Sequence, residues 1–401
     1  MSRSRRRLVP ALVGAACGLV MWSVSQLAFF RGVEDWLQDS SFAYRGVRRT
    51  STHVVIVGLD EDSSDEMPKP LAAISPELAE VVTYLNARKA AAIGLDIMIP
   101  DRLDAYDREK GLGGKALGAA ACAAGNVVLP MVLGDDRRPV LPLSSWRFCL
   151  EPDRIDFLPQ LALVELDPGA DEDEVIRHYW IAGSVEGVGY DSLPLAVLQV
   201  TPGPTKSGAA ADEGNPKLVT TDRAGGNVYV DYQPVPLDEA NRLRINYVGP
   251  PGTIPHVSFK DVLAAARAGS KTSVLVDKRG RAVDFDGAIV LIGATAHSLG
   301  DYHATPYTNA ALLAGRGGAR LMSGTELLAN VVATLSDGAF ITTPWWLVSL
   351  PWVIAAGAGL GLAFGGMTLP QGLLLCVAHH LAWRAFALAA FCLASWRVEV
   401  G

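Results

Sequence analysis

The fold of this chain is decided by a short apolar stretch, VVIVGLD, at residues 54–60. The stretch is rich in β-branched residues, does not alternate between apolar and polar positions, and ends in an aspartate. A short run of this kind is typical of a strand that is buried on both faces of a sheet. The same pattern returns at residues 90–97, 126–133 and 288–293. We therefore expect several buried strands in one sheet.

Helical patterns separate these strands. Residues 76–88 have helical periodicity, residues 112–124 form a run of small residues, and residues 324–335 form a further helix. Ser258 is a suitable N-cap for another helix at residues 259–268. Buried strands that alternate with helices predict an α/β fold, with a mixed, largely parallel sheet and helices on both faces. Less regular segments predict strands at residues 161–164, 175–181, 228–232 and 243–248, and a helix at residues 192–200.

The two ends of the chain are more apolar than its middle. Residues 8–30 are 23 residues without a charge, and about 20 are enough to cross the hydrocarbon core of a bilayer. Four arginines precede this run, so the positive-inside rule predicts a cytoplasmic N-terminus and a translocated middle. The alternatives are a cleaved signal peptide, for which residues 27–30 are a poor cleavage site, and a lipoprotein modified at Cys17.

Two more apolar runs lie near the C-terminus, at residues 345–365 and 372–396. We predict two transmembrane helices there, which makes three in the chain. The last run contains His379, His380 and Arg384, and an arginine at the centre of a bilayer is costly. These side chains are expected to face a neighbouring helix, or the segment lies shallow in the membrane. An intramembrane relay is the functional alternative.

Glycines spaced four residues apart recur in the apolar runs, as the pairs Gly14 and Gly18, and Gly357 and Gly361. Such GxxxG pairs let two helices approach each other closely. We expect these helices to pack with one another, or across a homodimer.

The expected domain organisation follows from the apolar runs. Residues 1–30 form an arginine-rich cytoplasmic tip and a transmembrane helix, and residues 31–343 form one extracytoplasmic domain. Residues 344–366 and 370–396 form the remaining transmembrane helices. This arrangement predicts a multi-pass protein of the bacterial inner membrane, with the lipid bilayer as one of its partners.

Composition disfavours several classes of function. The net charge is −7, and the lysines and arginines of the middle are scattered, whereas nucleic-acid binding needs clustered cations. We therefore expect no nucleic acid among the partners. The cysteines lack the spacing of a zinc site, and we expect no cofactor. Cys122 and Cys149 could form a disulfide in an oxidising compartment, and the sequence leaves this open.

Aspartates stand at the ends of two predicted strands. Asp60 ends the strand at residues 54–59, and Asp96 lies near the end of the next one. Because ligands of doubly wound sheets bind at the carboxyl ends of strands, these carboxylates could hold a cation or a polar ligand. The alternative is that they cap helices or fix loops. A phosphatase-like loop at residues 60–63 would also need Mg²⁺ and further acidic ligands, which we cannot place.

A glycine-containing turn, Gly-Ala-Thr-Ala, follows the last buried strand at residues 293–296. Backbone N–H groups of such a turn could bind an anion, although the P-loop lysine is missing. We include Thr295 and Asp301 with Asp60 and Asp96 as candidate ligand-binding residues. A metal site that uses Asp301 with His297 and His303 is the alternative, and ordinary hydrogen bonding within the loop is another.

Several blocks of the chain resemble, in order, the type-2 CHASE domain, an extracellular sensory module associated with bacterial cyclases and histidine kinases. Residues 54–60 with Ser63 are similar to the opening strand and Asp…Ser turn of the family. Residues 173–177, DEVIR, resemble its Asp-Gly-Val-x-Arg segment, with Glu174 where glycine is usual. The remaining blocks are IGLDI at 93–97, RINYVGP at 244–250, VSFKDVL at 257–263, VLIGATA at 290–296 with Gly300-Asp301 and Thr305-Pro306, and GTELLAN at 324–330.

The resemblance implies a membrane-anchored sensory module that binds a small-molecule or protein signal outside the cytoplasm and transmits it through its transmembrane helices. The family usually continues into three helices and a cytoplasmic cyclase, kinase or other output module, whereas this sequence has two apolar runs after the domain and stops at Gly401. We expect either a truncated chain or a separate cyclase or kinase partner.

Two other hypotheses compete with the sensor. One is a structural or interaction scaffold in a membrane complex, and the other is a metal-dependent extracytoplasmic enzyme that uses Asp60 and Asp96. Because no catalytic constellation is apparent, we do not expect an enzyme.

Overall fold

The chain folds into two compact units. The larger unit comprises Val47–Thr305 and Arg320–Phe340, and the smaller one comprises Met1–Gly46, Pro306–Ala319 and Ile341–Gly401. The computed structural model describes residues 3–25, 28–67, 69–134, 138–147, 161–164, 173–185, 188–202, 219–222, 227–269, 274–308, 320–343, 350–365 and 367–396.

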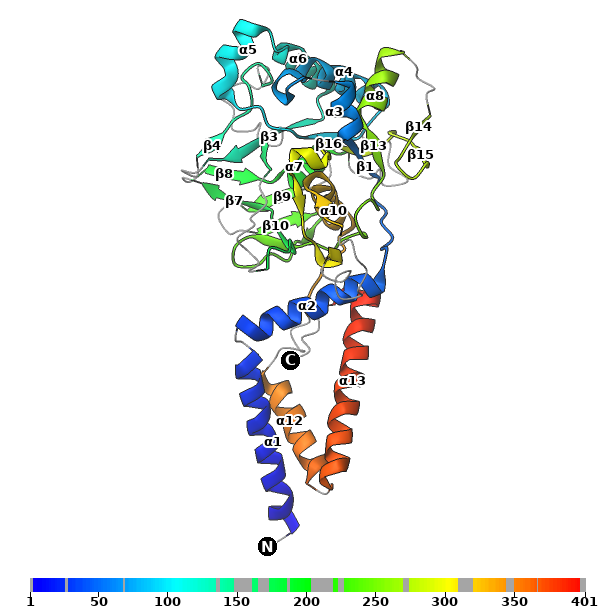
Figure 1. The fold of residues 1–401 in the computed structure, drawn as a ribbon. Helices are drawn as coiled ribbons and strands as arrows, with labels where there is room; N and C mark the ends of the chain where they lie inside the picture. The colour runs from blue at the N-terminus through cyan, green and yellow to red at the C-terminus, as the bar shows by residue number, and fades with distance from the viewer. Residues whose placement is uncertain are drawn as a thin grey trace, which may run out of the picture. The chain divides into compact units, whose positions relative to one another are not determined.

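The core of the larger unit is a seven-stranded sheet (Figure 1). Its parallel strands lie in the order β13, β1, β16, β2, β3 and β5, and β4 pairs antiparallel with β3. β16 comes late in the sequence but lies between β1 and β2. The predicted mixed, largely parallel sheet is therefore confirmed. The bounds are β1 (Val54–Leu59), β2 (Ala92–Asp96), β3 (Val127–Leu133), β4 (Pro139–Val140), β5 (Leu161–Leu163), β13 (His256–Ser258) and β16 (Ile289–Ala294).

Helices cover both faces of this sheet, as the sequence predicts (Figure 1). One layer holds α4 (Ser75–Ala87), α6 (Gly114–Ala124) and α8 (Phe259–Arg267), whose apolar side chains form one core with the strands. The other layer holds α7 (Leu193–Val200) and α10 (Gly324–Asp337). Because both faces are covered, all six residues of β1 are buried, which explains the uninterrupted apolar pattern that identified it.

Shorter elements surround the sheet. The helical ones are α3 (Glu61–Glu66), η1 (Leu71–Ala73), η2 (Asp101–Leu103), α5 (Asp104–Lys110) and η4 (His297–Leu299). The strands are β6 (His178–Trp180), β7 (Ala182–Val185), β8 (Val188–Asp191), β9 (Val219–Asp222), β10 (Asn227–Val230), β11 (Gln233–Pro234), β12 (Arg242–Arg244), β14 (Leu275–Val276), β15 (Ala282–Val283), β17 (Tyr302–His303) and β18 (Met322–Ser323).

Two local predictions differ from the structure. The strand expected at residues 243–248 is only the short β12, because side chains of α10 accept from two of the backbone N–H groups that follow it. Asn246 N donates to Thr334 Oγ1 over 3.2 Å, and Val248 N donates to Asn330 Oδ1 over 2.7 Å. Ser258 does occupy the N-cap position of α8, but its hydroxyl makes no cap hydrogen bond there.

The cysteines of the described residues fall into two states. Cys122 on α6 is disulfide-bonded, whereas Cys17 and Cys392 are free thiols. Cys149, the partner considered from the sequence, lies outside the described residues.

The described residues of the smaller unit form the helices α1 (Arg3–Ser25), α2 (Ala28–Arg45), α12 (Leu350–Phe364) and α13 (Leu369–Ala394). α1 packs against α12 through glycines. A Cβ atom added to Gly14 would meet the carbonyl oxygen of Gly357 and lie 2.8 Å from Gly361 Cα. The predicted close approach of glycine-containing helices is thus confirmed for this pair.

The sequence analysis missed α2, because it assigned residues 8–30 to one continuous apolar run. α2 is amphipathic, and its Phe42 side chain is almost completely buried. The Phe42 ring packs edge-on against Phe391 of α13 at 4.9 Å, and the Arg45 guanidinium lies 4.7 Å from the Phe391 ring centroid. Such contacts between aromatic rings and a guanidinium stabilise the junction of the two helices.

The prediction of three transmembrane helices is not met within the described residues. One helical segment there, Pro370–Ala394, is long and apolar enough to cross a membrane, and the apolar segments Leu8–Cys17 and Ile354–Phe364 are shorter. The segment that is long and apolar enough to cross a membrane is the one that contains His379, His380 and Arg384. In the first run the apolar helical segment found among the described residues is Leu8–Cys17. Residues 344–349 of the second predicted helix lie outside the described residues.

Candidate functional site

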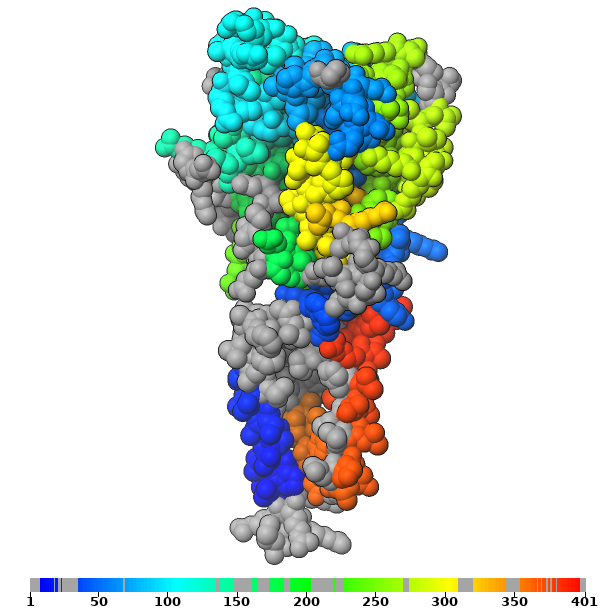
Figure 2. All heavy atoms as spheres, in the orientation of Figure 1, coloured from blue at the N-terminus to red at the C-terminus, as the bar shows by residue number. Residues whose placement is uncertain are grey.

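Four parallel strands end together at one edge of the sheet, which we call the carboxyl edge. The strand register pairs Ser258 with Gly58, Gly58 with Gly293, and Gly293 with Asp96. These residues form one row across β13, β1, β16 and β2. Figure 2 shows the loop after β16, in yellow, lying beside α3, in blue, on this side of the molecule. Ser298 of that loop donates to the Glu61 carboxylate of α3 through both its N and its Oγ, each at a distance of 2.8 Å.

The two glycines of the row make room for side chains. A Cβ atom on Gly58 would collide with the His256 ring and with Thr295 Oγ1. A Cβ atom on Gly293 would collide with Thr325 Oγ1 and lie 2.9 Å from Asp96 Oδ2. Glycine at both positions therefore lets polar groups from separate strands and from α10 meet above the strand ends.

Asp60 is held by partners at this edge. Its Oδ1 accepts from Ser63 N over 3.1 Å, from Ser63 Oγ over 2.7 Å and from Ser258 Oγ over 2.8 Å. Lys278 Nζ lies 3.1 Å from Oδ2. Burial raises the pKa of Asp60, but the two serine hydrogen bonds and the Lys278 charge outweigh it and hold the pKa below its usual value. Asp60 is thus the N-cap of α3 and an anchor for Ser258, as the capping alternative predicts.

Thr295 lies next to this network and pairs with a histidine. Its Oγ1 is 3.1 Å from His256 Nε2, and its carbonyl accepts from the Tyr302 hydroxyl over 2.8 Å. Burial and the charge of Lys278 lower the pKa of His256 to about 4, against the opposing charges of Asp60 and Asp277. At neutral pH His256 is therefore uncharged, so this group is a set of satisfied hydrogen bonds.

Asp96 is in a different situation, because it has one hydrogen-bond partner within the described residues. Thr325 Oγ1 donates to Asp96 Oδ2 over 2.6 Å, which leaves Oδ1 without a donor among those residues. Burial raises the pKa of Asp96 to about 7, the Thr325 hydrogen bond opposes the shift, and the charge of Asp301 adds to it. A carboxyl group perturbed in this way inside a cavity is a candidate for a functional site.

Asp96 lines a cavity of about 230 Å³ at the carboxyl edge. Asp301 and His303 line the same cavity, and His303 Nε2 lies 2.9 Å from Asp301 Oδ1. The side chains of Asp301 and His303 remain 38% and 27% exposed, so solvent reaches this side. Gly324, the first residue of α10, lies against the Asp301 carboxylate and has no side chain to obstruct it.

The four candidate residues therefore separate into two neighbouring groups. Asp96 and Asp301 share the cavity, whereas Asp60 and Thr295 belong to the hydrogen-bonded network beside it. His297 stacks on Tyr302 with ring centroids 3.9 Å apart and does not line the cavity. Sequence reasoning missed Thr325, because no local pattern links a helix residue to a strand aspartate 229 positions away.

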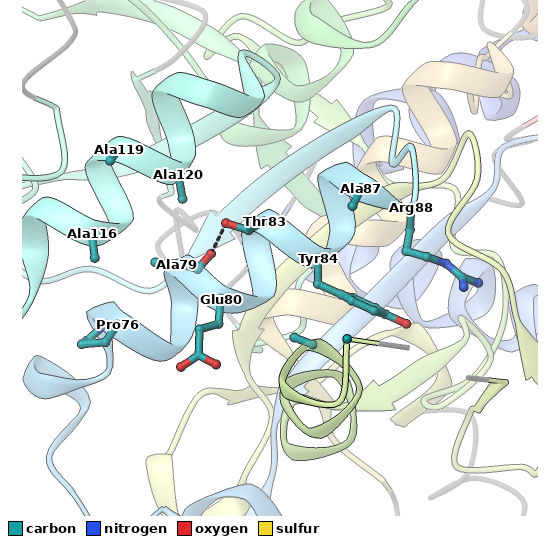
Figure 3. Close-up of a pocket in the computed structure, with 12 residues that line it drawn as sticks. Pro76, Ala79, Glu80, Thr83, Tyr84, Ala87, Arg88, Ala116, Ala119 and Ala120 are labelled. Carbon is teal, nitrogen blue, oxygen red and sulfur yellow. Dashed lines mark hydrogen bonds between the residues drawn. The ribbon is translucent and has the colours of Figure 1, made fainter. Parts of the chain in front are cut away.

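A second hollow, of about 830 Å³, lies on the layer formed by α4, α6 and α8 (Figure 3). Half of its lining residues are alanines, among them Ala79, Ala116 and Ala120. Its carboxylate, Glu80, is already paired with Arg267 at 2.9 Å. Because Asp96 keeps one carboxylate oxygen without a donor among the described residues, the carboxyl-edge cavity is the better candidate site.

Comparison with known families identifies the larger architecture. The model of the CHASE2 domain family matches residues 13–367. The chain belongs to the CHASE2 domain family. This is a family of sensory domains found outside the cell. No curated protein and no solved structure matches the chain in the corresponding searches.

The structure accounts for the departure from the CHASE2 pattern at Glu174. This residue has φ = 61°, in the left-handed region that favours glycine. Val175 and Ile176, which follow it, are buried, and Arg177 binds back to Asp173 through two hydrogen bonds of 2.8 and 2.7 Å. The glycine that is usual in the family therefore suits a turn that this chain forms with a glutamate.

Polar side chains at both ends of α10 bind other segments of the larger unit. Glu326 accepts from the backbone N–H groups of Gly252 and Thr253, at 2.8 and 3.1 Å. At the far end of α10, Asp337 accepts from Arg48 Nη1 over 2.8 Å and from Ser51 Oγ over 2.7 Å. These contacts at its two ends hold α10 in position as one rigid helix.

The described residues contain no group of three His, Cys, Asp or Glu side chains arranged to hold a metal ion. In the cavity Asp301 is already paired with His303, and in the neighbouring network the Asp60 oxygens are shared among Ser63, Ser258 and Lys278. The chemistry that the cavity offers is therefore recognition by carboxylates and apolar walls.

Proposed function

We propose that this CHASE2 protein is an extracytoplasmic sensor that binds a small ligand in the cavity at Asp96 and transmits binding through α10 to its membrane helices. The observation that carries the proposal is the position of α10. Gly324 and Leu328 of α10 line the cavity, and Asp337 at its other end binds the segment that follows α2 in the chain.

α10 is suited to transmission because it is buried and continuous. Its 14 residues span about 21 Å at 1.5 Å per residue, and its first twelve residues are all buried. A ligand that binds one position of α10 more tightly than another shifts the population toward that position. The shift reaches Ser51 and Thr52 through Asp337, and it reaches residues 338–343, which follow α10 directly.

We also propose how the chain is oriented in the membrane. The N-terminal arginines lie in the cytoplasm, the larger unit lies outside it, and the apolar helices cross or enter the inner membrane of a bacterium. A homodimer, or a separate cyclase or kinase, receives the change at the helices.

Ligand binding can be tested with the full-length protein in detergent. Thermal unfolding is measured against a library of metabolites and cations, because a ligand that binds only the folded state raises the unfolding temperature. Val132→Trp fills the cavity that Val132 lines, and Val276→Trp places the same ring at an exposed position away from it. We expect stabilising ligands to lose their effect in V132W and to keep it in V276W. Equal responses of the two variants would exclude the cavity as the site.

Transmission is tested separately by hydrogen exchange. With any ligand found in the screen, protection should change at residues 47–52 and 338–343. In Asp337→Ala the change at residues 47–52 should be lost while ligand binding persists. An unchanged pattern in both segments would favour the scaffold hypothesis.

A further inference from the structure

The cavity at Asp96 has a composition that selects one class of ligand. Its floor carries two carboxylates, Asp96 and Asp301, and no lysine or arginine is among the described residues that line it. The rest of the lining is mainly apolar: Gly324, His303 and Tyr179 contribute to it, and the other residues are Ile97, Met98, Pro130, Val132, Val164 and Leu328. This contrast between a negative end and an apolar body does not suit anions or sugars.

We propose that the ligand is a small organic cation, an amine with a short aliphatic or aromatic body, whose ammonium group binds Asp96 Oδ1 and Asp301. This inference rests on the proposed function and specifies its ligand. The Oδ1 atom of Asp96 accepts no hydrogen bond within the described part of the chain, while Oδ2 is held by Thr325. A protonated amine supplies the donors and the charge that such a carboxylate lacks.

Size restricts the ligand further. The cavity holds about 230 Å³, which is below the ~300–1,000 Å³ typical of pockets for drug-sized ligands. A body of a few carbon atoms fits, and a nucleotide does not. Contact with the apolar wall removes the apolar surface of such a body from water, which favours binding.

An inorganic cation fits less well. Mg²⁺ and Ca²⁺ require several oxygen ligands in a defined shell, and the described residues do not provide three metal-binding side chains together. His303 lies beside Asp301, and both side chains are partly exposed to solvent.

The protonation of Asp96 and of the amine predicts how amine affinity depends on pH. Asp96 must be ionised to bind an ammonium group, and its pKa is raised to about 7, whereas an alkylamine stays protonated up to about pH 10. Amine affinity should therefore increase from pH 6 to pH 8. The titratable groups that line the cavity are Asp96, Asp301, His303 and Tyr179.

The experiment uses three probes that share one body and differ in the charge of the head group: 3-methylbutylamine, 3-methylbutanol and 3-methylbutanoate. Binding to the full-length protein in detergent is followed by thermal unfolding and by isothermal titration, with Mg²⁺ and phenethylamine as further probes. We expect the two amines to bind and the alcohol, the carboxylate and Mg²⁺ not to. Asp96→Asn should weaken amine binding by about tenfold or more, and Asp65→Asn, at an exposed position on α3, should leave it unchanged.

The outcomes distinguish this inference from the proposed function. Binding of the alcohol or the carboxylate that is lost in Val132→Trp would overturn the amine assignment and leave the sensor cavity intact. If neither amine binds but the library screen finds ligands of another class, the amine assignment is again overturned and the proposed sensor cavity stands. Failure of every probe and of the whole library would overturn both. Amine binding that persists in Asp96→Asn would also overturn the assignment.

Discussion

The hydroxyl of Thr325 donates to Asp96 Oδ2 over 2.6 Å and so connects the first turn of α10 to the carboxyl end of β2. Thr325 is completely buried, and the contact is close because Gly293 on the strand between them has no side chain. Any ligand that engages the other oxygen of Asp96 therefore acts on a carboxylate that already holds α10. This is the physical link between recognition and movement in the proposed sensor.

Asp96 should make the protein less stable as pH rises. The carboxyl has a pKa of about 7 in the folded state and 3.8 as its usual value, so between these values the folded state binds more protons than the unfolded state. The free energy of unfolding then falls with increasing pH, by an amount on the order of a few kcal/mol. Asp96→Asn removes the charge and keeps an acceptor for Thr325. It should raise the unfolding temperature more at pH 8 than at pH 5, and equal increases would contradict the prediction.

Asp60 should behave in the opposite way. Its pKa is held below the usual value, so its contribution to stability is present above about pH 4 and is lost as pH falls through the folded-state pKa. Asp60→Asn weakens hydrogen bonds to a charged acceptor and should cost about 1–3 kcal/mol at pH 7, as measured by urea unfolding. If the variant instead kept its stability and lost its response to ligand, Asp60 would belong to the binding site.

The contacts of Asp337 predict a large effect from one substitution. Its carboxylate accepts from Arg48, Ser51 and Thr52, with distances of 2.7 to 3.2 Å. Asp337→Ala leaves several of these donors without a partner and should destabilise the larger unit by about 1–3 kcal/mol. Asp65→Ala removes an exposed aspartate on α3 and serves as the matched control. Similar denaturant midpoints for the two variants would show that the contacts at Asp337 contribute little.

Two neighbouring glycines on α12 should differ sharply. A Cβ atom on Gly361 would meet the Pro10 carbonyl oxygen and lie 3.0 Å from Gly14 Cα, whereas a Cβ atom on Gly359 has nothing within 4 Å. Gly361→Ala should therefore separate α1 from α12 and lower the unfolding temperature in detergent, since closely packed backbones depend on small residues. Gly359→Ala should be neutral or slightly stabilising. The result that would refute this packing is an equal effect of both substitutions.

Glu174 offers a stabilising change. Its φ of 61° costs a residue with a side chain about 1–2 kcal/mol relative to right-handed conformations, and glycine avoids most of that cost. Glu174→Gly should raise the free energy of unfolding by about 1 kcal/mol after the greater freedom of glycine in the unfolded chain is included. Asp65→Gly, which places glycine inside a helix, should lower it. A loss of stability in Glu174→Gly would mean that the glutamate makes contacts worth more than the backbone strain.

The fold was predictable because its strands are buried on both faces. Complete burial requires uninterrupted apolar residues, and that requirement is visible within six or seven residues, as in β1 and β16. The elements that were mispredicted depend on distant partners. Residues 245–248 look like a strand, but the N–H groups of Asn246 and Val248 donate to Thr334 and Asn330 of α10 instead of to a neighbouring strand. The amphipathic α2 was hidden because it follows an apolar run without a break in composition.

Local sequence is enough to place Asp60, Asp96, Thr295 and Asp301 at or after the ends of buried strands, since the end of an apolar run marks the end of a strand. Which of them are available to a ligand depends on contacts that form only in the folded protein. Asp60 is satisfied by a serine 198 positions away, whereas the partner of Asp96, 229 positions away, occupies one of its two oxygens. Hydrogen bonds between residues so far apart depend on strand order and on the placement of α10, and no local pattern of residues encodes either.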